Sequence, residues 1–154
     1  MSILSPFFEG CFSCERLKDY KPGCLTSRKS YSYCLINTAP LSQSRGHFFS
    51  LVHDGEKKQI YLFDPLGSDW GDPNVNLYLS KMTKDYRFNV IPSFQATQHI
   101  MSLACSYHCM AFILEHQSKP RGYPESFFEH FMYPPVLKND EIAIDLIMKY
   151  ISNI

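Results

Sequence analysis

Three stretches of this chain are rich in the apolar residues that β-strands favour. Residues 32–39 (SYCLINTA) have the composition of a β-strand, and the strand is expected to end at Pro40. Residues 47–67 are two apolar runs around an Asp-Gly pair, which is the pattern of a β-hairpin. Residues 87–94 (RFNVIPSF) predict one more strand. The first half of the chain therefore predicts a sheet that contains a hairpin.

Two longer segments have the pattern of apolar residues expected of helices. The run DPNVNLYLSKMTKDY predicts a helix that begins after Asp72. Residues 105–117 (CSYHCMAFILEHQ) predict a second helix. Its centre, 110–114, is apolar on all sides, so we expect this helix to be buried.

The two ends of the chain predict different kinds of structure. Residues 124–132 and 139–154 predict C-terminal helices, the second with Asn139 as its N-cap and acidic residues in its first turn. Residues 5–24 are rich in turn formers and aromatics, which predicts irregular packing with a short helical turn near residues 14–17. Strands and helices in this order predict an α+β domain.

Composition and charge narrow the class of protein. The 154 residues are 45% hydrophobic and 19% charged, which suits one globular domain spanning residues 1–154. Fifteen basic residues balance fifteen acidic ones, so we expect weak or no binding of nucleic acid. No apolar run is long enough to span a bilayer and the N-terminus lacks a signal-peptide pattern, so we expect neither membrane insertion nor secretion.

Six cysteines stand out in a chain without an export signal, where free thiols, metal ligands and catalytic groups are commoner than disulfides. The first four, Cys11, Cys14, Cys24 and Cys34, lack the second closely spaced pair that a zinc site normally has, so we expect no metal. A zinc-binding interaction protein stays open as an alternative. Cys109 is interpreted as a small core residue.

Most histidines lack a second catalytic or metal-binding residue at a spacing that would indicate a site. Five are therefore expected to be ordinary polar or half-buried residues: His53, His99, His108, His116 and His130.

His47 differs because the predicted hairpin brings it near Asp64. If the turn is centred on residues 55–56, residues whose numbers sum to 111 face each other, and 47 and 64 are such a pair. If the loop is residues 54–55, the sum is 109 and the two are diagonal neighbours. Either register puts both side chains on one face, where a carboxylate can orient a histidine base. A surface ion pair at a strand end explains the same pattern.

Cys105 supplies a group that such a pair could activate. It begins the buried helix, where unpaired N–H groups and the helix dipole favour a thiolate. Gln98 lies seven residues upstream, where its amide could join the Cys105 N–H in stabilising an oxyanion. Gln95 is a rival for that role, and a plain core cysteine is the alternative for Cys105.

With His47, Asp64, Gln98 and Cys105 in this order, the sequence resembles the adenain-type cysteine proteases, the maturation proteases of adenoviruses and related DNA viruses. The same order of groups is found in SUMO-specific proteases. The likeness extends over roughly residues 6–115 and includes four segments: PFFEGCF, INTAPLSQSRGHFF, IYLFDPLG and TQHIMSLACSYHCMAF.

The resemblance implies a fold and a set of roles. The fold would be a mixed central sheet packed against a buried catalytic helix. Cys105 would be the nucleophile, His47 the general base and acid, Asp64 the residue that orients His47, and Gln98 the oxyanion donor. His108 and Cys109 would have no part in the chemistry.

The resemblance also implies a biological setting. Family members cut viral structural precursor proteins at Gly-X or Gly-Gly sites during virion maturation, so the expected location is the virion and the host nucleus. The chemistry needs no cofactor. Adenain is activated by a disulfide-tethered peptide and by DNA, but residues 84–94 contain no cysteine for such a tether, and the net charge is zero.

Several residues depart from the family pattern. Asp64 replaces the usual Glu, Phe48 the Trp after the catalytic histidine, and Ser106 the Gly after the nucleophile, while Gln98 is followed by His99. None of these changes removes a catalytic atom. Two other readings stay open: a protease that removes ubiquitin or SUMO from host proteins, and a non-catalytic binding module with the same fold.

Overall fold

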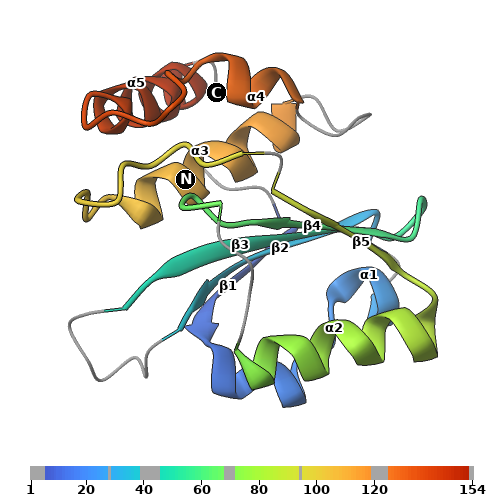
Figure 1. Ribbon diagram of the computed structural model, residues 1–154. Coiled ribbons are helices and arrows are strands. Elements are labelled where there is room, and N and C mark those ends of the chain that lie inside the picture. Colours follow the sequence, from blue (N-terminus) through green and yellow to red (C-terminus); the bar gives the residue numbers. More distant parts are fainter. Residues whose placement is uncertain are drawn as a thin grey trace.

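A five-stranded sheet lies between two layers of helices (Figure 1). The computed structural model describes residues 6–27, 29–38, 46–67, 72–93, 95–118 and 125–152. The strands are β1 (Phe8–Ser13), β2 (Tyr31–Asn37), β3 (Phe48–Asp54), β4 (Gln59–Phe63) and β5 (Asn89–Pro92). The helices are the 3₁₀ turn η1 (Cys14–Asp19), α1 (Gly23–Thr26), α2 (Pro73–Tyr86), α3 (Cys105–Ser118), α4 (Glu125–Glu129) and α5 (Asn139–Ser152).

The strands follow chain order, β1 to β5, across the sheet. The two edge pairs, β1–β2 and β4–β5, are parallel, whereas β2–β3 and β3–β4 are antiparallel. This mixed sheet with helices on both faces confirms the predicted α+β class. It also confirms the predicted strands, hairpin and major helices.

Side chains of β2, β3 and β4 point alternately into two cores, as the two-residue period of a strand requires. Tyr33 and Leu35 face the core under α3, α4 and α5, while Cys34 and Ile36 face the core over η1 and α2. Because helices cover both faces, these strands are apolar on both sides. Burial on both faces explains why residues 33–36 and 60–63 are continuous hydrophobic runs.

Helix α3 is buried around most of its circumference, as its apolar centre predicts, and packs on β3 on one side and α5 on the other. Its first residue, Cys105, thereby lies beside the first residue of β3, the central strand. Helix α2 begins as predicted: the Asp72 carboxylate accepts the N–H groups of Asn74 and Val75, at 2.9 and 3.1 Å. Within the described ranges, no helix has both the length and the apolar character to cross a membrane.

Two terminal predictions are wrong. Residues 8–13 were expected to pack irregularly but form strand β1. Backbone hydrogen bonds to β2 stabilise the strand, and the turn-rich sequence gives no sign of this pairing. Asn139 is the first residue of α5 but does not cap it with its side chain. That side chain is fully buried and binds Thr97 and Met132 instead.

Both predicted hairpin registers are also wrong. Ser50 pairs with Phe63 and Asp54 with Gln59, so the residue numbers of facing pairs sum to 113. The loop has four residues, 55–58, because the Asp54 carboxylate accepts the N–H groups of Glu56 and Lys57, at 3.0 and 2.9 Å. The sum is still odd, so His47 and Asp64 remain on one face of the sheet.

Candidate active site

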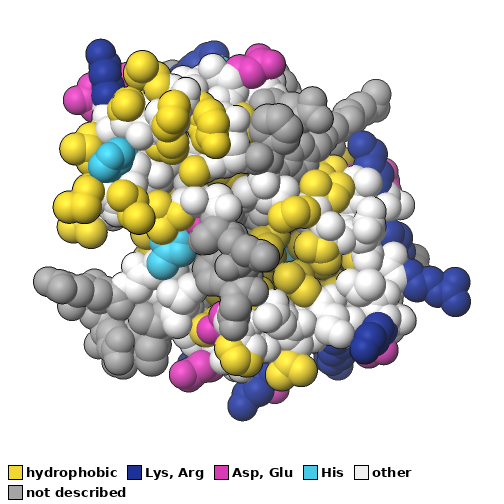
Figure 2. Space-filling view, viewed as in Figure 1, with side chains coloured by type: hydrophobic (Ala, Val, Ile, Leu, Met, Phe, Trp, Pro, Cys, Tyr) yellow, Lys and Arg dark blue, Asp and Glu magenta, His cyan; other side chains and the backbone are white. Residues whose placement is uncertain are grey.

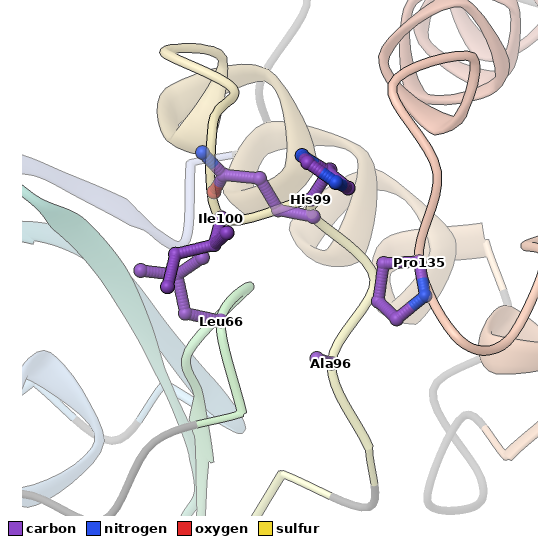
Figure 3. Close-up of a pocket in the computed structure, with 6 residues that line it drawn as sticks. Leu66, Ala96, His99, Ile100 and Pro135 are labelled. Carbon is purple, nitrogen blue, oxygen red and sulfur yellow. The ribbon is translucent and has the colours of Figure 1, made fainter.

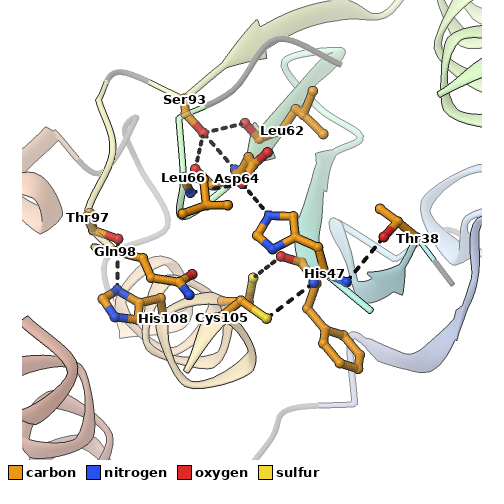
Figure 4. A network of polar contacts seen from close by, with 12 residues as sticks. Thr38, His47, Leu62, Asp64, Leu66, Ser93, Thr97, Gln98, Cys105 and His108 are labelled. Atoms are coloured by element: carbon orange, nitrogen blue, oxygen red, sulfur yellow. Dashed lines mark hydrogen bonds and ion pairs between the residues drawn. The ribbon is translucent and has the colours of Figure 1, made fainter. Parts of the chain in front are cut away.

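His47 lies at the entrance to β3. Its N–H donates to Thr38 Oγ1 at 3.2 Å, and its carbonyl accepts the Thr38 N–H at 2.9 Å, so the backbone is tied to the end of β2. The ring is 24% exposed, and Nε2 donates to Asp64 Oδ1 at 2.6 Å (Figure 4). This charge-assisted hydrogen bond leaves Nδ1 for a second partner.

Asp64 follows the last residue of β4 and is only 1% exposed. Its Oδ1 also accepts the Leu66 N–H at 2.9 Å, and its own N–H donates to Ser93 Oγ at 2.7 Å. The carboxylate is therefore held by His47 and by its own turn, while Ser93, which follows β5, holds the Asp64 backbone. Ser93 carried no recognisable signal in the sequence, because a serine after a strand usually has no special partner.

Cys105, at the N-terminus of α3, comes within reach of His47. Its Sγ is 3.4 Å from the N–H of Phe48, the residue after His47, and the side chain shares a hydrogen bond with the His47 ring. Phe48 contributes through its backbone, which no sequence motif could reveal. The structure thus brings together three of the four predicted residues within one constellation (Figure 4).

Electrostatics favour a charged pair at this point. Burial raises the pKa of the Cys105 thiol, but hydrogen bonds from His47 and from the N–H groups of Phe48 and Ser106 outweigh it, so the pKa is lowered from 9.0. Burial lowers the pKa of His47, while Asp64 and the Cys105 thiolate raise it to about 9. Both shifts favour the charged forms, a thiolate on Cys105 and an imidazolium on His47.

Gln98, the fourth predicted residue, lies on the loop before α3 and is 3% exposed. Its N–H, like that of Thr97, donates to the Pro65 carbonyl, at 3.0 and 2.8 Å, which ties this loop to the turn after Asp64. Nε2 donates one N–H to the Ser102 carbonyl at 3.0 Å. No described residue accepts its second N–H, which is thus available to an oxyanion. Figure 4 shows the amide beside the start of α3.

Gly67 explains how closely the two loops can approach. Its φ is +65°, in the left-handed region, and a Cβ at this position would lie 2.8 Å from the Ala96 nitrogen. Only glycine fits, so this residue holds the Asp64 turn against the Gln98 loop.

The remaining histidines and thiols lie elsewhere. His53, His108 and His116 are fully buried, so the expectation that they are half-buried is wrong, and each has a hydrogen-bond partner. His108 binds Asp140, not the thiol. Cys109 is buried beside the Phe48 carbonyl, and burial raises its pKa well above 9.0. The rival amide, Gln95, has no hydrogen bond to the site among the described residues. Those residues hold no cluster of three or more metal-ligating groups.

A pocket of about 390 Å³ adjoins Gln98. Mostly apolar side chains line it: Leu66, Ala96, Gln98, His99, Ile100 and Pro135. Figure 3 shows them converging from the Asp64 turn, the loop before α3 and the segment before α5. The pocket can take an apolar side chain next to the proposed oxyanion site.

A histidine held by a buried carboxylate, beside a low-pKa thiol at a helix N-terminus, defines a site of the cysteine protease class. A sequence profile of the adenovirus endoprotease family matches residues 8–131, and the chain belongs to this family. Membership in this family confirms the resemblance seen in the sequence. No curated protein matches the sequence.

Solved structures with a similar fold have little sequence in common with this chain. The Chlamydia trachomatis effector ChlaDUB1 superimposes with a TM-score of 0.56 at 11% identity, over 82% of this chain and 59% of that one. Cdu1 of Chlamydia trachomatis, bound to ubiquitin, gives 0.58 at 11% identity, over 93% and 69%. The SUMO protease Ulp1 gives 0.49 at 18% identity, over 96% and 72%. This chain thus spans less than two thirds of ChlaDUB1, and the likeness concerns the fold.

Proposed function

We propose that this protein is a cysteine endopeptidase of a DNA virus or a related element, which cleaves viral precursor proteins during virion maturation. One observation carries the enzymatic part of the proposal. A hydrogen bond of 2.6 Å joins Asp64 to His47, and His47 in turn lowers the pKa of the Cys105 thiol at the N-terminus of α3. A binding module that had lost catalysis would have no need for a buried carboxylate and a lowered thiol pKa.

Acylation begins with the Cys105 thiolate attacking the carbonyl carbon of the scissile peptide bond. The carbonyl oxygen gains negative charge and accepts hydrogen bonds from the second Nε2–H of Gln98 and from the Cys105 N–H. As the C–N bond breaks, the His47 imidazolium gives its Nδ1 proton to the leaving amine. The products of this step are a thioester on Cys105 and a free amine.

Deacylation uses the same groups in reverse. Neutral His47 takes a proton from water, and the hydroxide attacks the thioester carbonyl, again with the oxyanion at Gln98. The C–S bond breaks, the thiolate leaves and the carboxylic acid is released. Asp64 keeps the ring oriented and stabilises the imidazolium in both steps.

Gly-X and Gly-Gly sites are the proposed cleavage points. Family membership supports this proposal. The apolar pocket next to Gln98 would take an aliphatic side chain close by in the substrate. The virion and the host nucleus are the proposed location. An activating peptide, or DNA bound weakly by this protein of zero net charge, is the proposed regulator.

Removal of ubiquitin or a related modifier is the second candidate function, and an exposed apolar loop favours it. Figure 2 shows hydrophobic side chains gathered over the loop that leads into α3 and over α5. Ile100, Met101 and Leu103 are 81%, 74% and 97% exposed, next to Gln98. An apolar surface at the mouth of a protease suits recognition of a folded protein, since isolated peptides need no such area. Cdu1, of similar fold, has been solved with ubiquitin bound.

One experiment separates these functions. Gly-X and Gly-Gly peptide libraries, and fluorogenic ubiquitin and SUMO conjugates, are incubated with the wild type and with Cys105→Ala, with and without DNA. Cleavage of peptides by the wild type alone supports the endopeptidase. Cleavage of the conjugates alone supports deconjugation. If nothing is cut and iodoacetamide does not label Cys105 selectively at pH 7, the enzymatic proposal fails and a binding module remains.

A further inference from the structure

The loop of residues 97–104 joins the proposed oxyanion donor to the nucleophile. It has no regular helix or strand, so its shape must be fixed by contacts with its surroundings. Misplacement of an oxyanion donor by about 1 Å can cost a large part of a catalytic rate. The residues that hold this loop therefore bear directly on the proposed chemistry.

A buried histidine holds the first end of the loop. His108, on α3, is fully buried, and its Nδ1 is 2.8 Å from Thr97 Oγ1, next to Gln98. Its Nε2 is 2.9 Å from Asp140 Oδ1, in the first turn of α5. Burial outweighs the carboxylate and lowers the pKa of His108, so the ring is neutral. Because a carboxylate only accepts, Nε2 carries the proton and Nδ1 accepts the Thr97 hydroxyl.

The same carboxylate holds the second end of the loop. Ser102 Oγ donates to Asp140, at 2.7 and 2.9 Å from its two oxygens, and accepts the Ala104 N–H at 3.0 Å. The carbonyl of Ser102 is the group that accepts the Gln98 side chain. Asp140 is thus linked to Gln98 on two sides: through His108 and Thr97, and through Ser102.

Its neighbour on α5 adds a third contact. Asn139 Nδ2 donates to the Thr97 carbonyl at 2.8 Å, from a side chain that is fully buried. Both residues lie beyond the 8–131 segment that the family profile matches. Helix α5 therefore supplies this chain with a support for the oxyanion loop from outside the matched family segment.

We propose that Asp140 and His108 are positioning residues that hold the Gln98 amide where the oxyanion forms, which makes the C-terminal helix part of the active-site framework. This inference rests on the proposed protease function. It differs from a purely structural role in one measurable respect. Alkylation of Cys105 by iodoacetamide forms no oxyanion, so it reports on the thiolate and His47 alone, whereas peptide cleavage needs Gln98 as well.

The test compares Asp140→Ala with Glu141→Ala in the full chain. Glu141 is an exposed acid in the same first turn of α5, so the control removes a like charge from the same helix terminus. For each variant kcat and KM are measured on the peptide that the wild type cuts, with the rate of Cys105 alkylation. Asp140→Ala should lower kcat by about 10- to 100-fold and leave KM and the alkylation rate within about twofold. Glu141→Ala should change neither rate by more than about twofold.

A double-mutant cycle with Gln98→Ala sharpens the result. Once Gln98 is removed, Asp140→Ala should lower kcat by no more than about twofold further, because nothing remains to be positioned. Asp140→Asn, which keeps one acceptor oxygen but loses the second oxygen and the charge, should recover part of the lost kcat. If Asp140→Ala does not fold, Asp140→Asn and Ser102→Ala carry the comparison, each with a smaller drop of the same kind.

Two results would overturn the inference while leaving the protease intact. One is a loss of alkylation that parallels the loss of cleavage in the Asp140 and Ser102 variants, which would mean general destabilisation. The other is an equal effect of Asp140→Ala with and without Gln98. If the wild type cleaves no peptide and iodoacetamide does not alkylate its Cys105, the proposed function is refuted and this inference with it.

Discussion

Two histidine–aspartate pairs lie close together in this protein, and their burial is reversed. In the His47–Asp64 pair the carboxylate is buried, at 1% exposure, and the ring is 24% exposed; in the His108–Asp140 pair the ring is fully buried and the carboxylate is 25% exposed. The first ring has its pKa raised to about 9, while the second has its pKa lowered.

The difference shows that a carboxylate alone does not set the state of a histidine. Asp64 has little water around it, and the Cys105 thiolate adds a second negative charge, so together they overcome the cost of burying a charged ring. Asp140 is partly solvated and acts alone on a ring that burial keeps neutral. A ring that can gain and lose its charge can take up and release protons, whereas a ring that burial keeps neutral only directs hydrogen bonds.

Removal of the nucleophile is the most severe way to test which pair does the chemistry. Cys105→Ala should lower kcat/KM by at least about 10⁴-fold, because no group remains to form the thioester. Cys109→Ala is the matched control, one helical turn further along α3, and should retain most of the activity. Peptide cleavage followed by mass spectrometry measures both. Substantial turnover by Cys105→Ala would remove the first pair from the mechanism.

Replacing each aspartate by asparagine separates the two pairs. Asp64→Asn should lower kcat by on the order of 100-fold or more and should also slow the alkylation of Cys105 at pH 6 to 7, because the imidazolium loses its counter-charge. Asp140→Asn should reduce cleavage and spare alkylation. Stopped-flow alkylation and steady-state kinetics give the two numbers. Similar losses in both assays for both variants would show that the pairs are not distinct in role.

The pH dependence follows from the two shifts in the first pair. Activity needs Cys105 ionised and His47 protonated, so kcat/KM should rise with pH as the thiol, whose pKa lies below 9.0, loses its proton. It should fall again as His47 deprotonates at about 9. Asp140→Asn should lower this profile without moving either limb. A profile that is flat from pH 5 to pH 10 would contradict the charged pair.

The smallest expected effect concerns the contact between the two loops. Gly67→Ala places a Cβ against the Ala96 backbone at a left-handed φ, so it should lower the free energy of unfolding by about 1 to 3 kcal/mol. It should also reduce cleavage more than alkylation, since the displaced loop carries Gln98. Urea unfolding and the two kinetic assays test this prediction. An unchanged unfolding midpoint would show that the loops are not coupled here.

Local patterns in the sequence determined much of the fold. Apolar, β-favouring runs located β2, β3 and β4, and apolar patterns of helical length located α2, α3 and α5. Asp72 marked a helix start. Each of these signals lies within one element, which is why a single sequence shows it. The order of His47, Asp64, Gln98 and Cys105 was visible as well. The predicted register was wrong, but the residue numbers of facing pairs sum to an odd number in the predicted and the observed hairpin alike. This was enough to put His47 and Asp64 on one face of the sheet.

Only the tertiary structure decided the rest. Strand β1 depends on its partner β2, and the loop of residues 55–58 depends on how the Asp54 side chain folds back on its own turn. His108 and Asp140 are 32 residues apart in the sequence. The Asn139 side chain, predicted to cap its helix, instead binds Thr97, 42 residues earlier. Contacts between distant elements leave no periodic trace in a single sequence, because packing and not local propensity brings such residues together.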